Sequence, residues 1–149
     1  MYQAERVKVK KGSWGWDEAV TVQITCQNVV VATVASRSGS LLTYKRKESQ
    51  RNLISPQSYR ASIQIVGWSR MDPDLQRLSI TGLKDGNNGV YYKCSVSGQR
   101  KKVLAIYRYH QAGGQFLDGI LHIVGRGNQP GLRHILVSAF SSLGFSGNV

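Results

Sequence analysis

The residues with the most distinctive chemistry in this sequence are two cysteines, Cys26 and Cys94. Thiol groups act as nucleophiles, bind metal ions or form disulfides. A nucleophile needs a neighbouring base and a metal site needs closely spaced ligands, but no CxxC or HxxxH pattern accompanies either cysteine. The three histidines, His110, His122 and His134, lie at or beyond the end of the last strand expected in the sandwich.

The sequence also lacks paired carboxylates, a Ser/His/Asp set and a glycine loop of the kind that holds phosphate. GxGxxG is absent, and GRGNQPG, residues 125–131, resembles it only superficially, without the strand-turn-helix context of such a loop. We therefore expect no catalytic residues, no metal site and no cofactor, and we do not expect an enzyme.

Each cysteine lies in a segment where apolar and polar residues alternate, as in a strand with one buried face. Residues 20–26 place Cys26 on the apolar face, and residues 90–96 place Cys94 there. Two inward cysteines on different strands can meet across the core of a sandwich and form a disulfide, which would stabilise the fold by about 3 to 4.5 kcal/mol. The alternative is a pair of buried free thiols.

Short alternating segments separated by turns recur over the first 110 residues. The expected strands are residues 6–10, 20–26, 41–47, 59–68, 75–83, 90–96 and 103–110, and residues 27–40 begin as a strand or an ordered loop. About eight short strands spaced in this way predict an all-β protein with a two-layer sandwich. We assign this sandwich domain to residues 1–110.

After residue 110, charge nearly vanishes and glycine becomes frequent, so residues 111–149 are expected to form a C-terminal extension. Residues 117–124 are a candidate extra strand. Apolar residues three and four apart predict a helix over residues 132–145, preceded by Pro130. Its expected buried residues are Leu132, Ile135, Leu136, Ala139, Phe140 and Leu143. Because an apolar helix face must be covered, this extension is a candidate surface for a homo-oligomer.

Net charge is the strongest signal in the composition. The 149 residues include 20 Lys and Arg but only 8 Asp and Glu, which gives a formal net charge of +12. All the Lys and Arg residues except Arg126 and Arg133 precede residue 111. Such a surface attracts polyanions through a long-range, salt-sensitive field. The alternative is that the charge serves only solubility.

Four segments together resemble the framework of a V-set immunoglobulin domain, in particular the domains of the polymeric immunoglobulin receptor and related leukocyte surface receptors. They are VKVKKG, VTVQITC, LLTYKRK and RLSITGLKDGNNGVYYKC, within residues 5–109. The resemblance implies an immunoglobulin-like Greek-key sandwich whose disulfide joins Cys26 and Cys94. Tyr92, two residues before the second cysteine, would pack in the core and bond nearby backbone through its hydroxyl.

The resemblance also assigns structural roles to three further residues. Leu83 matches the last position of the family's L-x-I-x-x-L strand, and Asp85 is the nearest acid that could pair with Arg60. The sequence departs from the family where Thr43 stands in place of the core tryptophan, and where Asn88 stands in place of an aspartate. The chain is thus expected to be a divergent relative.

Domains of this family are recognition modules, so the resemblance implies a receptor domain that binds a protein or an acidic ligand through loops at one end. It would be secreted or lie on the extracellular side of the plasma membrane, because a disulfide indicates an oxidising compartment. The sequence itself shows no signal peptide and no apolar run long enough to span a membrane. The expected binding loops are residues 27–40, 47–52 and 97–102.

The candidate ligand-binding residues are the cations of these loops and of the neighbouring strand: Arg37, Lys45, Arg46, Lys47, Arg51, Arg100, Lys101 and Lys102. An alternative function is a basic β-sandwich that binds a polyanion, either a sulfated sugar such as heparan sulfate or nucleic acid. Tyr107 and Tyr109, on either side of Arg108, could then stack on bases, although tyrosines on such a strand also serve as packing residues. A third hypothesis is a self-associating structural protein.

Overall fold

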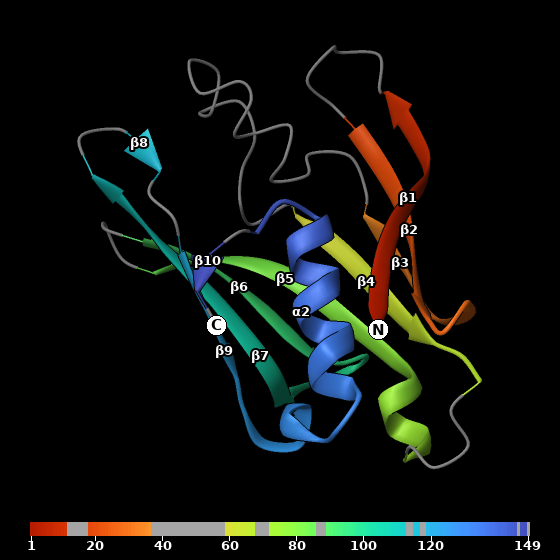
Figure 1. Ribbon diagram of the computed structural model, residues 1–149. Coiled ribbons are helices and arrows are strands. Elements are labelled where there is room, and N and C mark those ends of the chain that lie inside the picture. Colours follow the sequence, from red (N-terminus) through yellow and green to blue (C-terminus); the bar gives the residue numbers. More distant parts are fainter. Residues whose placement is uncertain are drawn as a thin grey trace.

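The computed structural model describes residues 1–11, 18–36, 59–67, 72–85, 89–112, 115–116, 119–145 and 147–148. These residues form mainly β-strands, with one α-helix and short 3₁₀ helices (Figure 1). In chain order the elements are β1 (Tyr2–Lys11), β2 (Glu18–Cys26), β3 (Val29–Ser36), β4 (Arg60–Ile65), η3 (Pro73–Gln76), β5 (Arg77–Asp85), β6 (Gly89–Val96), β7 (Gln99–Ala112), β8 (Gln115–Phe116), β9 (Gly119–Ile123), η4 (Gly125–Asn128), α2 (Leu132–Ser142) and β10 (Gly147–Asn148).

The strands form one sheet in the order β1-β2-β3-β4-β5-β6-β7-β9-β10, with β8 paired to β7. All pairs are antiparallel except β9 with β10. The prediction of an all-β protein is therefore confirmed. The described strands β1 to β7 follow each other as a meander, whereas the resemblance implies a Greek-key order in two sheets.

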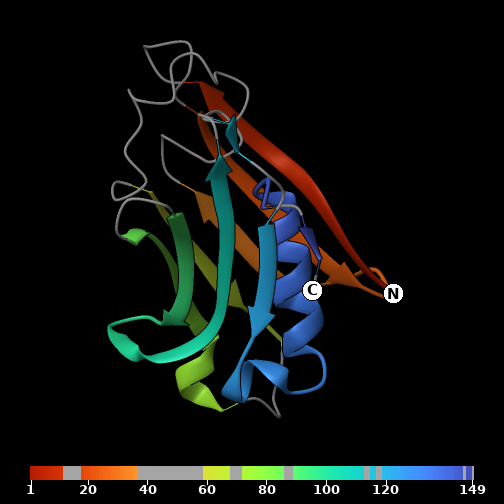
Figure 2. The same cartoon turned by 90° about the vertical axis from the view of Figure 1, so that its left-hand side faces the viewer.

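Helix α2 takes the place that a second sheet would occupy in a sandwich. Figures 1 and 2 show it in the concavity of the curved sheet, with β1 and β2 on one side and β7 and β9 on the other. Contacts of α2 with β1, β2, β3 and β9 agree with this placement. We call the face of the sheet that packs against α2 the inner face and the opposite face the outer face.

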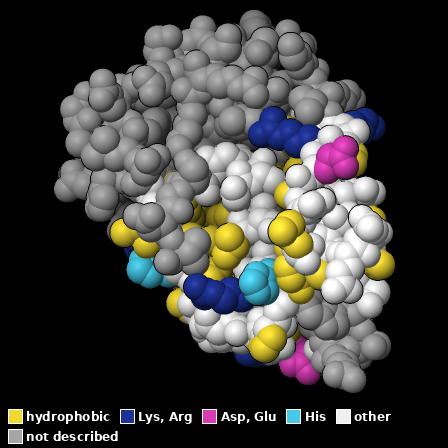
Figure 3. All heavy atoms as spheres, in the orientation of Figure 1, with side chains coloured by type: hydrophobic (Ala, Val, Ile, Leu, Met, Phe, Trp, Pro, Cys, Tyr) yellow, Lys and Arg dark blue, Asp and Glu magenta, His cyan; other side chains and the backbone are white. Residues whose placement is uncertain are grey.

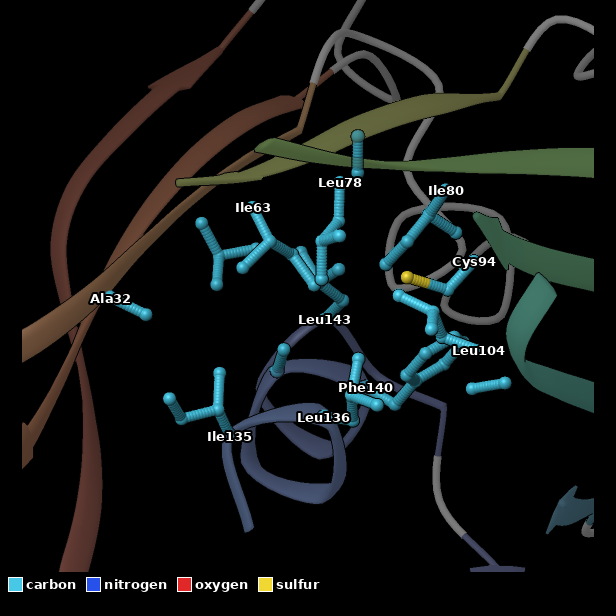
Figure 4. Close-up of a cluster of buried hydrophobic side chains, with 14 of the residues drawn as sticks. Ala32, Ile63, Leu78, Ile80, Cys94, Leu104, Ile135, Leu136, Phe140 and Leu143 are labelled. Atoms are coloured by element: carbon cyan, nitrogen blue, oxygen red, sulfur yellow. The ribbon is translucent and has the colours of Figure 1, made fainter. Parts of the chain in front are cut away.

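The six residues predicted to form the buried side of the helix are all buried, five of them completely (Figure 4). They pack against inner-face residues such as Ile63, Leu78 and Ile80, which alternation also predicted to point inward. The helix is also tied to the edge strand, because Arg6 Nη2 donates a hydrogen bond to the Ser142 carbonyl at 3.3 Å. Among the described residues, no helix is long and apolar enough to span a membrane.

The predicted boundary at residue 110 does not separate two cores. Strand β7 continues to Ala112, and β9, within the candidate strand 117–124, pairs with it antiparallel. Leu121 of β9 and the buried residues of α2 belong to the same hydrophobic cluster as those of β2 to β7. The C-terminal segment thus supplies the second layer of the fold, which explains why the apolar side of α2 is covered within one chain.

The prediction of a disulfide between Cys26 and Cys94 is wrong, since both residues are free cysteines. Cys26 ends β2 and Cys94 lies in β6, with three strands between them in the sheet. At about 4.8 Å per strand they are about 19 Å apart along the sheet, far beyond the roughly 7 Å between Cα atoms that a disulfide tolerates. Complete burial raises the pKa of the Cys94 thiol to about 12.

An aromatic cluster fills the core beneath β6 and β7. Tyr92 is buried, as predicted, and its ring centroid lies 5.3 Å from that of Tyr59 and 4.5 Å from that of Phe145. Tyr107 is also fully buried, and its hydroxyl accepts a hydrogen bond from the Gly119 amide at 3.2 Å. Tyr107 therefore serves packing, so the hypothesis that it stacks on bases is wrong. The side chain of Tyr109 lies outside the described residues.

Candidate anion-binding site

The outer face of the sheet is polar, because the alternation that sends apolar residues inward sends hydroxyls and cations outward. One row runs across three strands: Arg60 of β4 lies opposite Thr81 of β5, which lies opposite Lys93 of β6. The next row consists of serines, Ser62, Ser79 and Ser95, on the same strands. Cationic and hydroxyl donors are thus adjacent on one surface.

A bulge in the hairpin between β6 and β7 brings two more cations to this face. Val96 pairs with Gln99, but Ser95 pairs with Val103, so residues 100–102 are extra on β7. Gly98, with φ of +77°, makes the turn. In Figure 2 this blue-green hairpin, at the lower left, projects away from α2. A 2.7 Å hydrogen bond between the Ser79 and Ser97 hydroxyls holds this turn to β5.

The hairpin and the outer face together enclose a hollow of about 820 Å³. Its described lining combines three cations with hydroxyl-bearing and small residues: Ala35, Ser36, Arg60, Ala61, Ser62, Ser79, Thr81, Ser95, Gly98, Arg100 and Lys101. A second hollow of about 260 Å³ shares Arg60, Thr81 and Arg100 with it and adds Lys93. The two hollows are therefore adjacent, and together we call them the cationic groove.

The described lining of the cationic groove contains no acidic residue. Arg60 is held in place, since its Nη1 donates a 2.7 Å hydrogen bond to the Tyr59 carbonyl. On the opposite side of the molecule, which Figure 3 shows, Lys and Arg side chains lie apart from one another among neutral and hydrophobic ones. Among the described cations, Arg60, Lys93, Arg100 and Lys101 gather at the cationic groove.

Two acids near the hairpin are engaged in ion pairs outside the groove. Arg126 of η4 donates two hydrogen bonds to the Asp74 carboxylate and one to Asp72, each at 2.8 Å. Lys102 Nζ lies 3.6 Å from Asp74 as well. The hydrogen bonds from Arg126 hold the pKa of Asp74 at about 2, below its usual value of 3.8. This cluster connects η3, η4 and the hairpin.

The eight predicted binding residues do not all lie at one site in the structure. Arg100 and Lys101 line the cationic groove, whereas Lys102, next in sequence, pairs with Asp74 instead. The other five candidates lie outside the described residues: Arg37, Lys45, Arg46, Lys47 and Arg51.

The expected loops differ from the structure in the part that is described. In the described part of residues 27–40, Gln27 and Asn28 form a turn with positive φ, and Val29–Ser36 form β3, the strand that was one of the two expectations for this segment. Residues 99–102, expected in a turn, belong to β7. The hairpin register depends on pairing across strands, which a local turn signal does not specify.

Of the three residues assigned structural roles by the resemblance, Arg60 and Leu83 line the site. Arg60 lies opposite Thr81, and Thr81 precedes Asp85 by four residues on β5. The side chain of Asp85 is not described. Leu83 lies half-buried on the outer face and lines the smaller hollow. Arg60 is therefore a groove residue that the sequence analysis interpreted only as structural.

The sequence analysis missed the contribution of Ser62, Ser79, Thr81 and Lys93 to this site. A signal for them existed, since each occupies an outward position of an alternating strand. Their assembly depends on the pairing of β4, β5 and β6, which comes from the tertiary structure.

Within the described part of the chain, no three His, Cys, Asp or Glu residues gather as they would to hold a metal ion. No protein family, curated protein or solved structure matches this chain. Because a fold by itself does not specify a function, the function is argued from the chemistry of the cationic groove.

Proposed function

We propose that this protein is a binding protein, without catalytic activity, for a polyanion that carries phosphate or sulfate groups. The observation that supports this proposal is the cationic groove, where Arg60, Lys93, Arg100 and Lys101 surround a floor of serine and threonine hydroxyls without a described acid. Guanidinium, ammonium and hydroxyl groups are the donors that bind anionic oxygens.

The electrostatics of the whole chain support the same ligand class. A net charge of +12 increases the rate at which polyanions encounter the surface, and the groove concentrates donors where a bound anion makes several contacts at once. The described lining contains neither a carboxylate nor an imidazole to act as a general base, so its chemistry supports binding more than catalysis.

The site differs in position from that of the receptor domain that the immunoglobulin resemblance implies. Such a domain would bind through loops at one end, whereas the cationic groove lies on a sheet face and takes only Arg100 and Lys101 from an expected loop. An acidic ligand is common to both hypotheses, and only the polyanion hypothesis explains why hydroxyls of β4, β5 and β6 line the groove.

Fluorescence anisotropy with labelled heparin and a labelled oligonucleotide, from about 50 to 200 mM NaCl, tests this proposal. We expect Arg100→Ala and Lys101→Ala each to weaken binding by about 3- to 10-fold. The slope of log K against log salt should become shallower by about 0.7 to 0.9 for each cation that no longer neutralises a phosphate or sulfate group.

The matched control is Lys8→Ala, which removes one positive charge from an exposed position on β1. It should change the affinity by less than about twofold, because a distant exposed charge is screened by salt. Circular dichroism confirms that each variant is folded. The proposal is wrong if neither polyanion binds at the lowest salt, or if Lys8→Ala weakens binding as much as the groove variants do.

A further inference from the structure

A second feature of the outer face lies beside the cationic groove. Tyr91 of β6 pairs with Arg108 of β7, which in turn pairs with Ile120 of β9. The Arg108 guanidinium lies over the Tyr91 ring, with Cζ 4.7 Å from the ring centroid. These three side chains form a planar and apolar row across three strands, which we call the stacking row.

The side chains of the stacking row are partly or fully exposed to solvent. Arg108 is exposed, Tyr91 is half-buried, and Ile120 is 47% exposed. The other large hydrophobic residues this exposed in the described chain are Met1 before β1, Val7 on β1 and Val29 at the start of β3. Exposed planar and apolar surface of this kind suits a ligand with flat, apolar faces.

The stacking row meets the row of Arg60, Thr81 and Lys93 on β6, and from there the two rows extend in opposite directions across the sheet. Lys93 is two residues from Tyr91 on β6, and Arg60 and Thr81 continue that row onto β4 and β5. Alternate residues of one strand lie about 7 Å apart, a distance that the sugar of one nucleotide can span between its base and its phosphate. A ligand with both flat rings and anionic groups could therefore contact both rows at once.

We propose that the polyanion is a single-stranded nucleic acid, whose bases stack on Tyr91, Arg108 and Ile120 while its phosphates lie in the cationic groove. This inference rests on the proposed function and specifies its ligand. Bases stack on aromatic rings and on guanidinium planes, but in a duplex their faces are covered by neighbouring bases. A sulfated sugar lacks flat aromatic faces and would leave the stacking row unused.

The experiment compares a short oligothymidine with an abasic oligomer of the same length and phosphate number, using the full chain. The wild-type protein should bind the oligothymidine at least about fivefold more tightly, because stacking contributes with every base. It should also prefer the single strand to a duplex of the same length at equal salt.

Two pairs of variants separate stacking from charge. Tyr91→Ala should abolish the preference for bases, whereas Tyr91→Phe, which keeps the ring, should retain it. Arg108→Lys, which keeps the charge but removes the guanidinium plane, should reduce the preference and leave binding of the abasic oligomer within about twofold. Lys101→Ala should weaken the binding of both oligomers.

The two proposals fail in different ways. Equal affinity of the wild-type protein for the oligothymidine and the abasic oligomer would overturn the nucleic-acid inference and leave the polyanion proposal standing. The same conclusion would follow if heparin bound more tightly than the oligothymidine and Tyr91→Ala did not change the affinity for heparin. Absence of binding to every polyanion would overturn both. Because the comparison of oligomers uses the wild-type chain, it does not depend on whether a variant folds.

Discussion

The inner and outer faces of the sheet carry side chains of opposite character on the same strands. On β5, Leu78 and Ile80 are completely buried against α2, whereas Ser79 and Thr81 line the cationic groove on the other side. On β6, Tyr92 and Cys94 are buried, whereas Tyr91 and Lys93 face the ligand surface that we propose. One set of strands thus provides both the core and the candidate site.

The two faces differ because the inner face is buried in the core, whereas the outer face is polar and partly exposed to solvent. Buried apolar area stabilises the fold at about 25 cal/mol per Å², so the inner face is constrained in size, shape and polarity. None of the described helices or strands covers the groove on the outer face, so the described part of this face contributes little burial. Substitutions on the outer face should change ligand binding without unfolding the chain. Substitutions on the inner face should destabilise the fold without a direct effect on ligand binding.

The largest change in stability is expected when an aromatic side chain of the core is replaced by alanine. Phe140 is completely buried, with its ring centroid 5.5 Å from that of Phe145 and 6.4 Å from that of Tyr107. We expect Phe140→Ala to lower the free energy of unfolding by about 3 to 5 kcal/mol, measured by urea denaturation. Ile120→Ala on the outer face should cost less than about 1 kcal/mol, and an equal loss would contradict the division of roles.

The second test compares the two cysteines by their reactivity. Cys94 is completely buried with a raised pKa, and Cys26 is half-buried at the end of β2. In the native protein at neutral pH, a maleimide should label Cys94 at least about 100-fold more slowly than Cys26, because the thiolate must form and the site must open. Mass spectrometry of labelled peptides measures both rates, and similar rates would show that the inner face is accessible.

The third test uses the ion pairs that hold the hairpin. The pKa of Asp74 is lowered to about 2 by Arg126, so its carboxylate stabilises the folded state above the usual carboxylate pKa of 3.8. That contribution is lost as the pH falls from about 4 to about 2. Asp74→Asn should therefore melt below the wild type at neutral pH, and the difference should vanish near pH 2. Glu5→Gln on β1 is the control, and a pH-independent difference for Asp74→Asn would contradict this account.

The smallest effect on stability is expected in the cationic groove itself. Lys101 is exposed and Thr81 is half-buried, and neither contributes to the described core. Lys101→Ala and Thr81→Ala should each change the free energy of unfolding by less than about 0.5 kcal/mol while weakening the binding of polyanions. Thermal unfolding checks the first expectation and anisotropy the second, and a large loss of stability would mean that the groove is part of the core.

Much of the local structure could be predicted from periodicity. Alternation identified β2, β4, β5 and β6 and the faces of their residues, and the three- and four-residue spacing identified α2 with its buried side. These signals are reliable because a strand or a helix presents its own residues to two sides, whatever its neighbours are. The error about Cys26 and Cys94 has the same origin, since alternation placed both correctly on the inner face but did not state which strands are adjacent.

The candidate site could be predicted only in part. The basic run Arg100 to Lys102 was recognised, but the sequence does not show that a bulge directs Arg100 and Lys101 into a groove while Lys102 pairs with Asp74. Arg60 was predicted to have only a structural role, and Tyr91 was not predicted to bind a ligand. Their role depends on residues from other strands that lie opposite them.

The sequence by itself determined the charge of this protein, most of its described strands, its one described α-helix and the buried side of these elements. These properties are local, because they depend on residue type and on spacings of two to four residues. Only the tertiary structure decided that β1 to β7 form a single meander, that α2 covers its inner face, and that Arg60, Lys93, Arg100 and Lys101 gather beside Tyr91 and Arg108. The pairing of strands is set by burial and hydrogen bonding between distant segments, and local patterns do not encode it.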